Sequence, residues 1–310
     1  MILAPMQGLT EVMFRRVYEE CFPGAIASAV SPFISLTHGN LADAWKKIDD
    51  VWPESNLGSM PVVPQILGKE PEEFVELGNR LFDVGYPEIN WNIGCPMRAI
   101  TGKHRGSGIL PYPDEMRAVL DSIIPRLRPQ LSIKMRLGLR SNEEILELVP
   151  VLNDYPLSSI TIHPRTGRQM YSGEVDLDAF GRVMPLFLAP VIYNGDICTK
   201  GDAERIKRRF PSLADIMVGR GVLYRPTLPL EIAGATISDE ERIALSRNFI
   251  VRLMQEIKDR MPSEQATMRK MKEYWCLLWK SLPISETQAR VVLHEQTLEA
   301  VEKTIWQLTQ

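Results

Sequence analysis

One cysteine of this chain is placed where a thiol could do chemistry. Cys95 lies in the stretch NWNIGCPMRAITGKHRGSG, residues 90–108, after an apolar run and before a loop that contains Lys103, His104 and Arg105. A thiol on such a loop can donate a proton to a substrate or attack it as a nucleophile. It can equally be a small apolar side chain packed beneath the loop, because free cysteines are often buried. We interpret the remaining cysteines as structural: Cys21, Cys198 and Cys276.

Polar and charged residues also stand at the ends of most other apolar runs. They are Pro5–Met6, Gln65, Asn92–Cys95, Lys134–Arg136, His163–Arg165, Asn194–Asp196 and Gly219–Arg220. Any one of them could be structural, and a histidine in a strand is more often a hydrogen-bonded core residue than a ligand. Lys134 is harder to explain in that way, because a buried ammonium without an anionic partner is costly. We therefore interpret the set as one functional site.

Eight short apolar runs position these residues. They cover 1–6, 25–33, 61–67, 88–94, 131–138, 159–165, 189–196 and 215–221. Their hydrophobicity is nearly continuous rather than alternating, as in the strands of a parallel sheet that is covered on both faces. Segments with helical spacing separate most of the runs: 70–85, 112–127, 141–155 and 199–210.

Two of the helical segments carry clear start signals. Pro71 suits the first turn of the segment 70–85, and Thr199 suits the N-cap of the segment 199–210. In the segment 70–85 we expect one buried face, formed by Phe74, Leu77, Leu81 and Phe82.

The alternation of eight strands with helices predicts an α/β fold, a (β/α)8 or TIM barrel. The rival is an open doubly wound sheet, which normally has fewer strands and, for dinucleotides, a GxGxxG turn after the first strand. Here the first strand ends in APMQGLT, which favours the barrel. After residue 236 only helical patterns follow, over 238–261, 263–282 and 285–308. We therefore predict a barrel over 1–235 and a small all-helical domain over 236–310.

The last two strands of the predicted barrel carry a more specific signal. NGDI precedes the helix capped by Thr199, and VGRG follows the final strand. Backbone N–H groups and a guanidinium at this place in a barrel are typical of a phosphate site. We expect a phosphorylated ligand there.

Composition and charge narrow the class of protein. The chain has 310 residues, 45% of them hydrophobic, and a net charge of −3, so nothing global indicates a polyanion partner. A basic groove can nevertheless lie on an acidic protein. Four scattered cysteines without a CxxC pair predict neither a metal site nor a disulfide framework. No apolar run approaches the roughly 20 residues of a membrane span, and we expect no signal peptide because strand-like sequence begins at Met1. We expect a cytoplasmic monomer.

Six motifs follow one another along the chain: APMQGLTEVMFR, NIGCP, IKMRLG, IHPRTGRQMYSG, VIYNGDI and MVGRG. In this order and spacing they resemble the bacterial tRNA-dihydrouridine synthases, flavoenzymes that reduce selected uridines in tRNA. The resemblance covers nearly the whole chain. It implies an FMN-binding catalytic barrel and a helical domain that binds tRNA, with NADPH or NADH as the reductant of FMN.

The same resemblance implies a role for each residue of the site. Cys95 would protonate carbon 5 of the uracil while carbon 6 receives hydride from reduced FMN, and Lys134 would stabilise the anionic reduced flavin. The other implied flavin-binding residues are Ala4, Pro5, Met6, Gln65, His163, Asn194, Gly195, Asp196, Gly219 and Arg220. Four of them would bind the phosphate of the flavin: Asn194, Asp196, Gly219 and Arg220. The residues that would orient the uracil or neighbouring RNA are Asn92, Arg136 and Arg165.

The helical domain leaves two interpretations open. It carries 11 basic and 11 acidic side chains over 239–310, so it is not basic overall. Its stretch RKMKEYWCLLWK nevertheless gathers Arg269, Lys270, Lys272 and Lys280 around Tyr274, Trp275 and Trp279. Either the aromatic residues are core and the charges are solvated, or the basic side also contacts the RNA backbone.

Two alternative functions remain at this point. One is an FMN barrel that acts on a small molecule, such as a dihydroorotate-type or enoate reductase, which would share the fold and the phosphate site. The other is an RNA-binding protein without catalysis that keeps the barrel as a scaffold. Bound flavin would exclude the second alternative, and the dihydrouridine content of tRNA would test the first.

Overall fold

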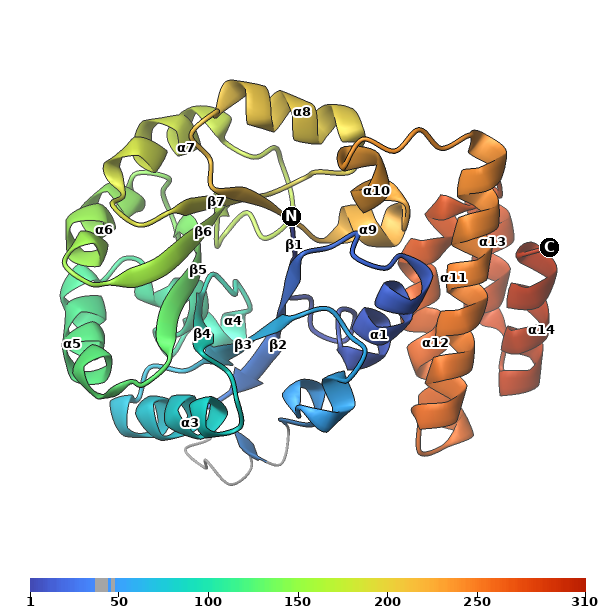
Figure 1. Cartoon of the computed structure of the whole chain (residues 1–310), viewed down its shortest axis with the longest axis horizontal. Coiled ribbons are helices and arrows are strands. Elements are labelled where there is room, and N and C mark those ends of the chain that lie inside the picture. Colours follow the sequence, from blue (N-terminus) through green and yellow to red (C-terminus); the bar gives the residue numbers. More distant parts are fainter. Residues whose placement is uncertain (37–43, 46–47) are drawn as a thin grey trace.

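The computed structural model describes residues 1–36, 44–45 and 48–310. Eight parallel strands form a closed barrel in which each strand pairs with the next and β8 pairs with β1 (Figure 1). The strands are β1 (Ile2–Leu3), β2 (Ser28–Ser35), β3 (Val62–Leu67), β4 (Glu88–Ile93), β5 (Gln130–Gly138), β6 (Leu157–Thr166), β7 (Val191–Asn194) and β8 (Asp215–Val218). The predicted barrel is confirmed.

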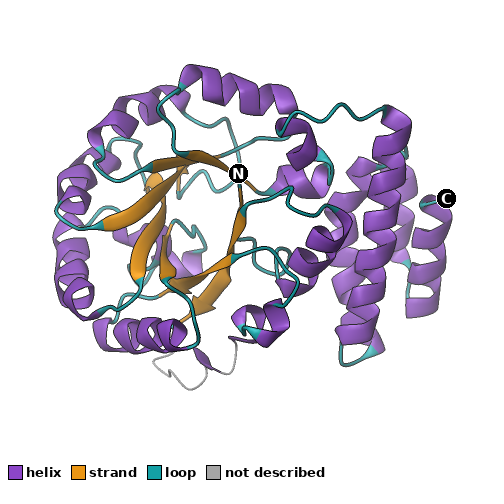
Figure 2. Ribbon diagram, in the orientation of Figure 1, coloured by secondary structure: helices purple, strands orange, loops and turns teal. Residues whose placement is uncertain are grey.

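Helices surround the barrel and continue beyond it (Figure 2). Those of the barrel region are α1 (Val12–Cys21), α3 (Pro71–Asp83), α4 (Arg98–Thr101), α5 (Pro113–Ile123), α6 (Glu144–Asn153), α7 (Leu177–Val183), α8 (Lys200–Arg209), α9 (Arg220–Tyr224) and α10 (Leu228–Ile232). The C-terminal helices are α11 (Asp239–Arg260), α12 (Glu264–Leu278), α13 (Glu286–His294) and α14 (Leu298–Leu308). None of the helices in the described part of the chain has the length and apolar character needed to cross a membrane.

The local signals in the sequence set most helix boundaries correctly. Pro71 opens α3, and Thr199 caps α8 through a reciprocal pair of hydrogen bonds with Asp202, at 3.1 and 2.9 Å. On α3 the predicted face is buried except for Phe82, whose side chain is 38% exposed. Phe82 directly follows the fully buried Leu81, and one residue turns the helix by about 100°, so Phe82 leaves the buried face.

Several predicted elements differ in extent, since β1 covers only Ile2–Leu3 of the run 1–6 and β7 only Val191–Asn194 of the run 189–196. Two others contain a turn that the prediction misses. The run 215–221 is not one strand, because β8 ends at Val218 and the chain turns at Gly219 into α9. The run 285–308 is not one helix, because α13 ends at His294 and Thr297 caps a new helix by accepting the N–H of Ala300.

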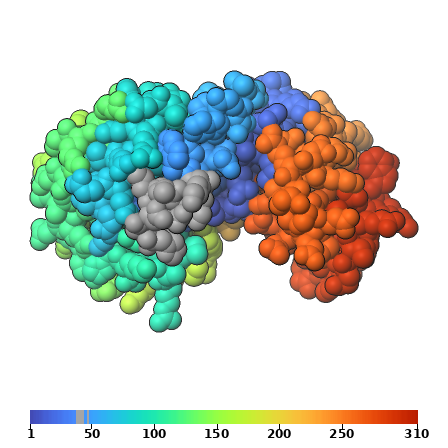
Figure 3. All heavy atoms as spheres, turned by 90° about the horizontal axis from the view of Figure 1, so that it is seen from below, coloured from blue at the N-terminus to red at the C-terminus, as the bar shows by residue number. Residues whose placement is uncertain are grey.

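The C-terminal helices pack against the first helix of the barrel. Phe249 of α11 contacts Phe14 and Tyr18 of α1, with ring centroids 5.5 and 5.7 Å apart. Figure 3 accordingly shows N-terminal residues between the barrel and the C-terminal helices. The connection from α10 to α11 spans 233–238, which includes the boundary that we predict from the sequence.

Candidate active site

The carboxyl ends of the strands enclose a cavity of about 440 Å³. Because parallel strands end on the same side of a barrel, residues far apart in sequence converge there. Thirteen of the fifteen residues that we predict for the site line this cavity: Ala4, Pro5, Met6, Asn92, Cys95, Lys134, Arg136, His163, Asn194, Gly195, Asp196, Gly219 and Arg220. The volume is that of an ordinary small-molecule or cofactor site.

The two other predicted residues, Gln65 and Arg165, are not among the residues that line the cavity. Gln65 is fully buried, and its oxygen accepts from the amide of Asn92 at 2.8 Å. Its own amide donates to Asn90 at 2.7 Å, and Asn90 in turn donates to Ser132 at 2.9 Å. Gln65 therefore fixes Asn92 from inside the barrel.

Hydrogen bonds to both the N–H and the carbonyl of Cys95 hold the loop that carries this residue. The side-chain oxygen of Asn92 accepts the backbone N–H groups of Gly94 at 3.1 Å and Cys95 at 2.9 Å. The carbonyl of Cys95 accepts the N–H and the hydroxyl of Ser107, at 2.9 and 3.1 Å. Gly106 has a φ of +55°, and a Cβ there would lie 2.6 Å from that carbonyl. Only glycine fits this close approach.

The thiol of Cys95 is half-buried and protonated at neutral pH. Burial raises its pKa above the ordinary value, against the opposing effects of the Met97 backbone N–H, Arg136 and Lys134. A protonated thiol can give up a proton but is a poor nucleophile. The setting favours the acid over the nucleophile among the two chemistries that the sequence leaves open.

The basic residues that follow Cys95 in sequence do not set its pKa. His104 lies 2.8 Å from a carboxylate oxygen of Glu115 and stacks on Tyr112. Arg105 pairs with Glu70 at 2.9 Å. The cations that act on the thiol come from β5 instead.

Lys134 brings an amine without a partner to the cavity. The register of β4 and β5 places it beside Asn92. Within the described residues its ammonium has no hydrogen-bond or ion-pair partner. Burial, with a smaller effect from Arg136, lowers its pKa to about 7. An ammonium in this state fits an anionic ligand, whose charge would raise that pKa again.

Arg136 acts as a clamp between two loops. Its guanidinium donates to the carbonyls of Gly94 at 3.0 Å, Thr166 at 2.9 Å and Met170 at 2.6 Å. It therefore joins the loop after β4, which carries the thiol, to the loop after β6. The side chain is 2% exposed, so its donors are largely occupied within the protein.

His163 is neutral and its tautomer follows from its neighbour. Burial and four nearby cations, among them Lys134 and Arg165, lower its pKa well below the ordinary value. Nη1 of Arg165 lies 3.1 Å from Nε2 of His163. A guanidinium can only donate, so Nε2 accepts and the ring proton is on Nδ1. His163 therefore has one N–H left to donate.

Asp196 is paired with two guanidiniums at the end of the cavity where the sequence predicts a phosphate. It binds Arg165, and Nη2 of Arg220 lies 2.9 Å from its Oδ1. Its φ is +43°, a conformation that few residues other than glycine adopt. The carboxylate thus holds Arg220 in place, and a phosphate would be contacted by Arg220 rather than by Asp196.

Several cavity residues are not predicted from the sequence. They include Phe33, Met97, Met170, Tyr171, Cys198 and Leu277. We interpret Cys198 as structural from its neighbours in sequence, and in the structure this residue lies in the cavity wall. Tyr171 lies within the motif IHPRTGRQMYSG, which is a usable signal. Leu277 belongs to α12, and no sequence signal places that helix against the barrel.

Helix α12 is tied to the loop that carries Pro5 and Met6. Lys270 donates to the carbonyl of Gly8 at 2.8 Å and pairs with Glu11 at 3.1 Å, and the hydroxyl of Tyr274 donates to the carbonyl of Leu9 at 2.6 Å. A Cβ on Gly8 would lie 2.4 Å from Oε1 of Glu273.

The basic stretch of α12 is largely used within the protein. Lys272 donates to the carbonyls of Leu293 at 3.0 Å and Glu295 at 2.5 Å, and Nζ of Lys280 lies 4.2 Å from the ring centroid of Tyr224. Trp275 is fully buried. Tyr274 and Trp275 are core residues, as both interpretations of this stretch require.

Comparison with known proteins identifies related chains. A family model described as dihydrouridine synthase matches residues 2–307. A tRNA-dihydrouridine(16) synthase of Pseudomonas putida is 29% identical over 296 residues, which are 91% of this chain and 88% of that protein. One of Aquipseudomonas alcaligenes is 26% identical over 314 residues, 98% of each chain. A tRNA-dihydrouridine synthase B of Vibrio cholerae is 30% identical over 233 residues, 75% of this chain and 70% of that protein.

Solved structures share the barrel at low sequence identity. The old yellow enzyme homologue from Zymomonas mobilis has a TM-score of 0.50 and 10% identity, covering 77% of this chain and 90% of its own. The structure of TcOYE with pHBA has a TM-score of 0.50 and 13% identity, covering 75% of this chain and 88% of its own. At these identities the likeness concerns the fold alone.

Proposed function

Because the chain belongs to the dihydrouridine synthase family, we propose that it is a tRNA-dihydrouridine synthase that uses FMN, with NADPH or NADH as reductant, to reduce the 5,6 double bond of a uracil base. The relatives named as tRNA-dihydrouridine synthases support the substrate. The cofactor and the roles of the residues rest on the resemblance, and the cavity geometry agrees with them.

The cavity suits a flat anionic cofactor. Ala4, Pro5 and Met6 supply apolar wall, Lys134 supplies a cation without a partner, and Arg220 supplies a guanidinium at the phosphate end. Gly195 leaves no room for a side chain, since a Cβ there would lie 2.9 Å from Cγ1 of Val175. Bound FMN would supply hydride chemistry to this cavity.

The protein's own part in the reaction is the handling of charge and protons. Hydride addition to carbon 6 leaves negative charge on the uracil, which a proton at carbon 5 must neutralise. Cys95 is protonated at neutral pH and its loop is fixed by Asn92 and Ser107, so it can deliver that proton. Lys134 holds positive charge where the resemblance places the flavin, and His163 offers the N–H on Nδ1.

We propose uridine 16 as the target. The relatives of Pseudomonas putida and Aquipseudomonas alcaligenes, each aligned over more than nine-tenths of this chain, are both named for that position. The synthase B of Vibrio cholerae aligns over a smaller share of both chains. We expect the enzyme to act as a monomer in the cytoplasm, together with its tRNA.

The observation that carries the proposal is the presence, in one cavity, of the protonated Cys95 on a fixed loop and the unpartnered Lys134. The test is a strain that lacks this protein, whose tRNA is analysed position by position. Loss of dihydrouridine at position 16, restored by the wild-type chain but not by Cys95→Ala, is the expected result. Unchanged tRNA would contradict it and favour an FMN barrel with a small-molecule substrate. A purified protein without flavin would favour an RNA-binding protein without catalysis.

A further inference from the structure

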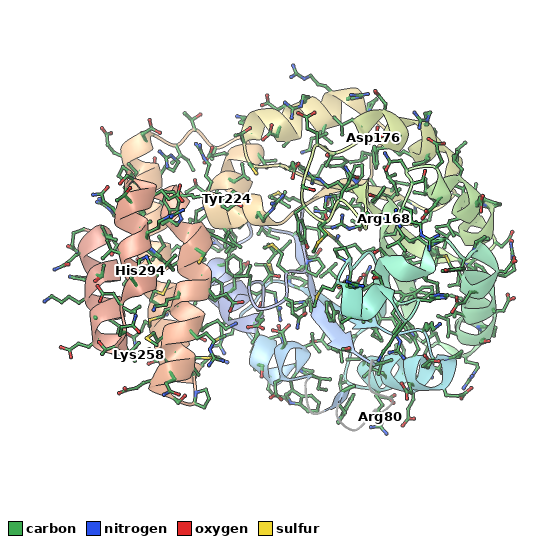
Figure 4. All side chains as sticks on the ribbon, turned by 180° about the vertical axis from the view of Figure 1, so that it is seen from behind. Arg80, Arg168, Asp176, Tyr224, Lys258 and His294 are labelled. Carbon is green, nitrogen blue, oxygen red and sulfur yellow. The ribbon has the colours of Figure 1, made fainter. Side chains whose placement is uncertain are left out.

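A second hollow, of about 490 Å³, adjoins the active-site cavity and shares Pro96 and Met170 with its wall. Three arginines line it, each from a different segment that follows a strand: Arg98 in α4, Arg140 after β5 and Arg168 after β6. We call this hollow the arginine groove. Figure 4 shows Arg168 on the barrel, well away from Lys258 and His294 of the C-terminal helices.

The three guanidiniums carry free positive charge. All three residues are exposed, and among the described residues none of their side chains has a hydrogen-bond or ion-pair partner. The residues that line the groove include no Asp or Glu. The nearby carboxylate of Glu144 is occupied, because it accepts the backbone N–H groups of Leu139, Arg140 and Ser141. That of Glu115 is engaged by His104 and Lys69.

The backbone around the groove is fixed and locally strained. In the described part of the chain only three residues other than glycine have a positive φ: His104, Met170 and Asp196. His104 lines the groove, Asp196 lines the cavity, and Met170 lines both. Such conformations are unfavourable for residues other than glycine and cluster at functional sites. The strain thus marks the groove and the cavity as one functional surface.

Apolar side chains form the rim between the two hollows. Met97 is 51% exposed and Met170 is 48% exposed, and Tyr171 beside them is 58% exposed. An unpaired nucleic-acid strand is bound by surfaces of this kind. Its bases pack on exposed apolar and aromatic side chains, and its phosphates bind free cations.

We propose that the arginine groove binds phosphates of the tRNA strand next to the reacting uridine, while flanking bases pack on Met97, Met170 and Tyr171. This inference rests on the proposed function, because it needs a uridine in the cavity. A base that enters the cavity leaves its neighbours at the rim, and the next phosphates then reach the groove. It adds an RNA contact on the loops of the barrel, whereas Lys270 and Lys272 of α12 are already bound within the protein.

The test removes the three charges together. The variant R98Q/R140Q/R168Q is compared with R126Q/K207Q/R208Q. The control removes three exposed charges: Lys207 and Arg208 near the end of α8, and Arg126 after α5, which pairs with Glu72. These helices run back along the barrel, so their carboxyl ends lie at the end of the barrel remote from the cavity. Affinity for unmodified tRNA is measured for the flavin-loaded proteins at several salt concentrations.

The groove variant is expected to bind tRNA at least tenfold more weakly. The slope of log K against log salt should be less steep by about 2, because three phosphate contacts are lost. The control variant should match the wild type. Equal affinity and slope in the two variants would overturn the proposal. Normal tRNA binding with slower reduction of flavin by NADPH would overturn it too, and would indicate that the groove binds the phosphates of the dinucleotide.

Two further measurements make the outcome unambiguous. The single variants R98Q, R140Q and R168Q are measured as well, so that poor folding of the triple variant leaves three smaller expected losses to check. Dihydrouridine formation by the wild type is measured first. Its absence would contradict the proposed function, whereas an active wild type with an unaffected groove variant would overturn only the inference about the groove.

Discussion

The side-chain oxygen of Asn92 accepts the backbone N–H of Cys95 at 2.9 Å, while the amide of Asn92 is held by Gln65 at 2.8 Å. The chain of hydrogen bonds continues through Asn90 to Ser132 inside the barrel. Buried networks of this kind are rigid when every member is satisfied. The position of the thiol is thus set by the core of the barrel and not by the surface loop alone.

Asn92 gives the first prediction. Asn92→Ala leaves the N–H groups of Gly94 and Cys95 without an acceptor, at a cost of about 1–3 kcal/mol for each buried group. We expect a lower melting temperature and an at least tenfold slower oxidation of reduced flavin by tRNA. Asn92→Asp keeps an acceptor for both N–H groups but loses the donor to Gln65, so it should recover only part of each loss. If Asn92→Asp recovers the melting temperature but not the rate, the amide acts on the base itself, as the resemblance implies.

Lys134 gives a pH dependence. Its pKa is about 7 in the folded protein and about 10.4 in an unfolded chain, so the unfolded state binds more protons between these values. The free energy of unfolding of the flavin-free protein therefore rises with pH across this window, by up to about 1.4 kcal/mol for each pH unit. Lys134→Met removes this rise. Parallel urea titrations of wild type and variant between pH 7 and 10 isolate the contribution, and identical pH profiles would contradict it.

Lys134 should also govern the binding of anionic flavin. The ammonium form is the form that binds an anion, so affinity for reduced FMN should fall as the pH rises above about 7. Lys134→Met should bind reduced flavin more weakly at pH 7 and show a flatter pH dependence. Flavin fluorescence and reduction by NADPH are the measurements. Wild-type flavin content with normal reduction in the variant would remove Lys134 from the site.

The sequence predicts the barrel and its strand-end residues well, for a physical reason. Buried parallel strands must be continuously apolar, so a polar residue such as Asn92 or Lys134 at the end of a run is visible without a structure. Phe82 and the run 215–221 are less accessible to this reasoning. The exposure of Phe82 depends on the angular position of one residue on a helix. The end of β8 depends on the turn that the chain makes at Gly219.

What the sequence cannot predict is contact between distant segments. Leu277 enters the cavity wall only because α12 packs on the loop after β1. Arg165 belongs to an apolar run that ends at the cavity, yet it turns toward His163 and Asp196 instead of lining the cavity. Side-chain pairing of this kind is set by which charges meet after folding.

Lys270 and Arg269 offer a matched pair on α12. Lys270 donates to Gly8 and pairs with Glu11 and Glu273, whereas Arg269 is exposed and has no partner among the described residues. Lys270→Gln should lower the free energy of unfolding by about 1–2 kcal/mol, because a charged hydrogen bond is lost. Arg269→Gln should be neutral in stability. A shallower salt dependence of tRNA binding in Lys270→Gln with unchanged stability would instead indicate that Lys270 contacts the RNA.

The state of the Cys95 thiol gives the last prediction. Burial raises its pKa, so at neutral pH it should react slowly with iodoacetamide and remain available as an acid. Cys95→Ala should still bind FMN and accept electrons from NADPH, since neither step uses the thiol. Only oxidation of the reduced flavin by tRNA should slow, by about 10²–10⁴-fold for loss of a general acid.

Cys95→Ser separates acid catalysis from packing. A hydroxyl fills nearly the same space but is a far weaker acid than a thiol, so it should restore little of the rate. Damage to the fold would instead lower flavin content and melting temperature together in both variants. Because Asn92 and Ser107 bind the backbone of residue 95 and not its side chain, we expect neither variant to disturb the loop. Turnover of tRNA by Cys95→Ala at the wild-type rate would show that the loop is only architecture and that the proton comes from elsewhere.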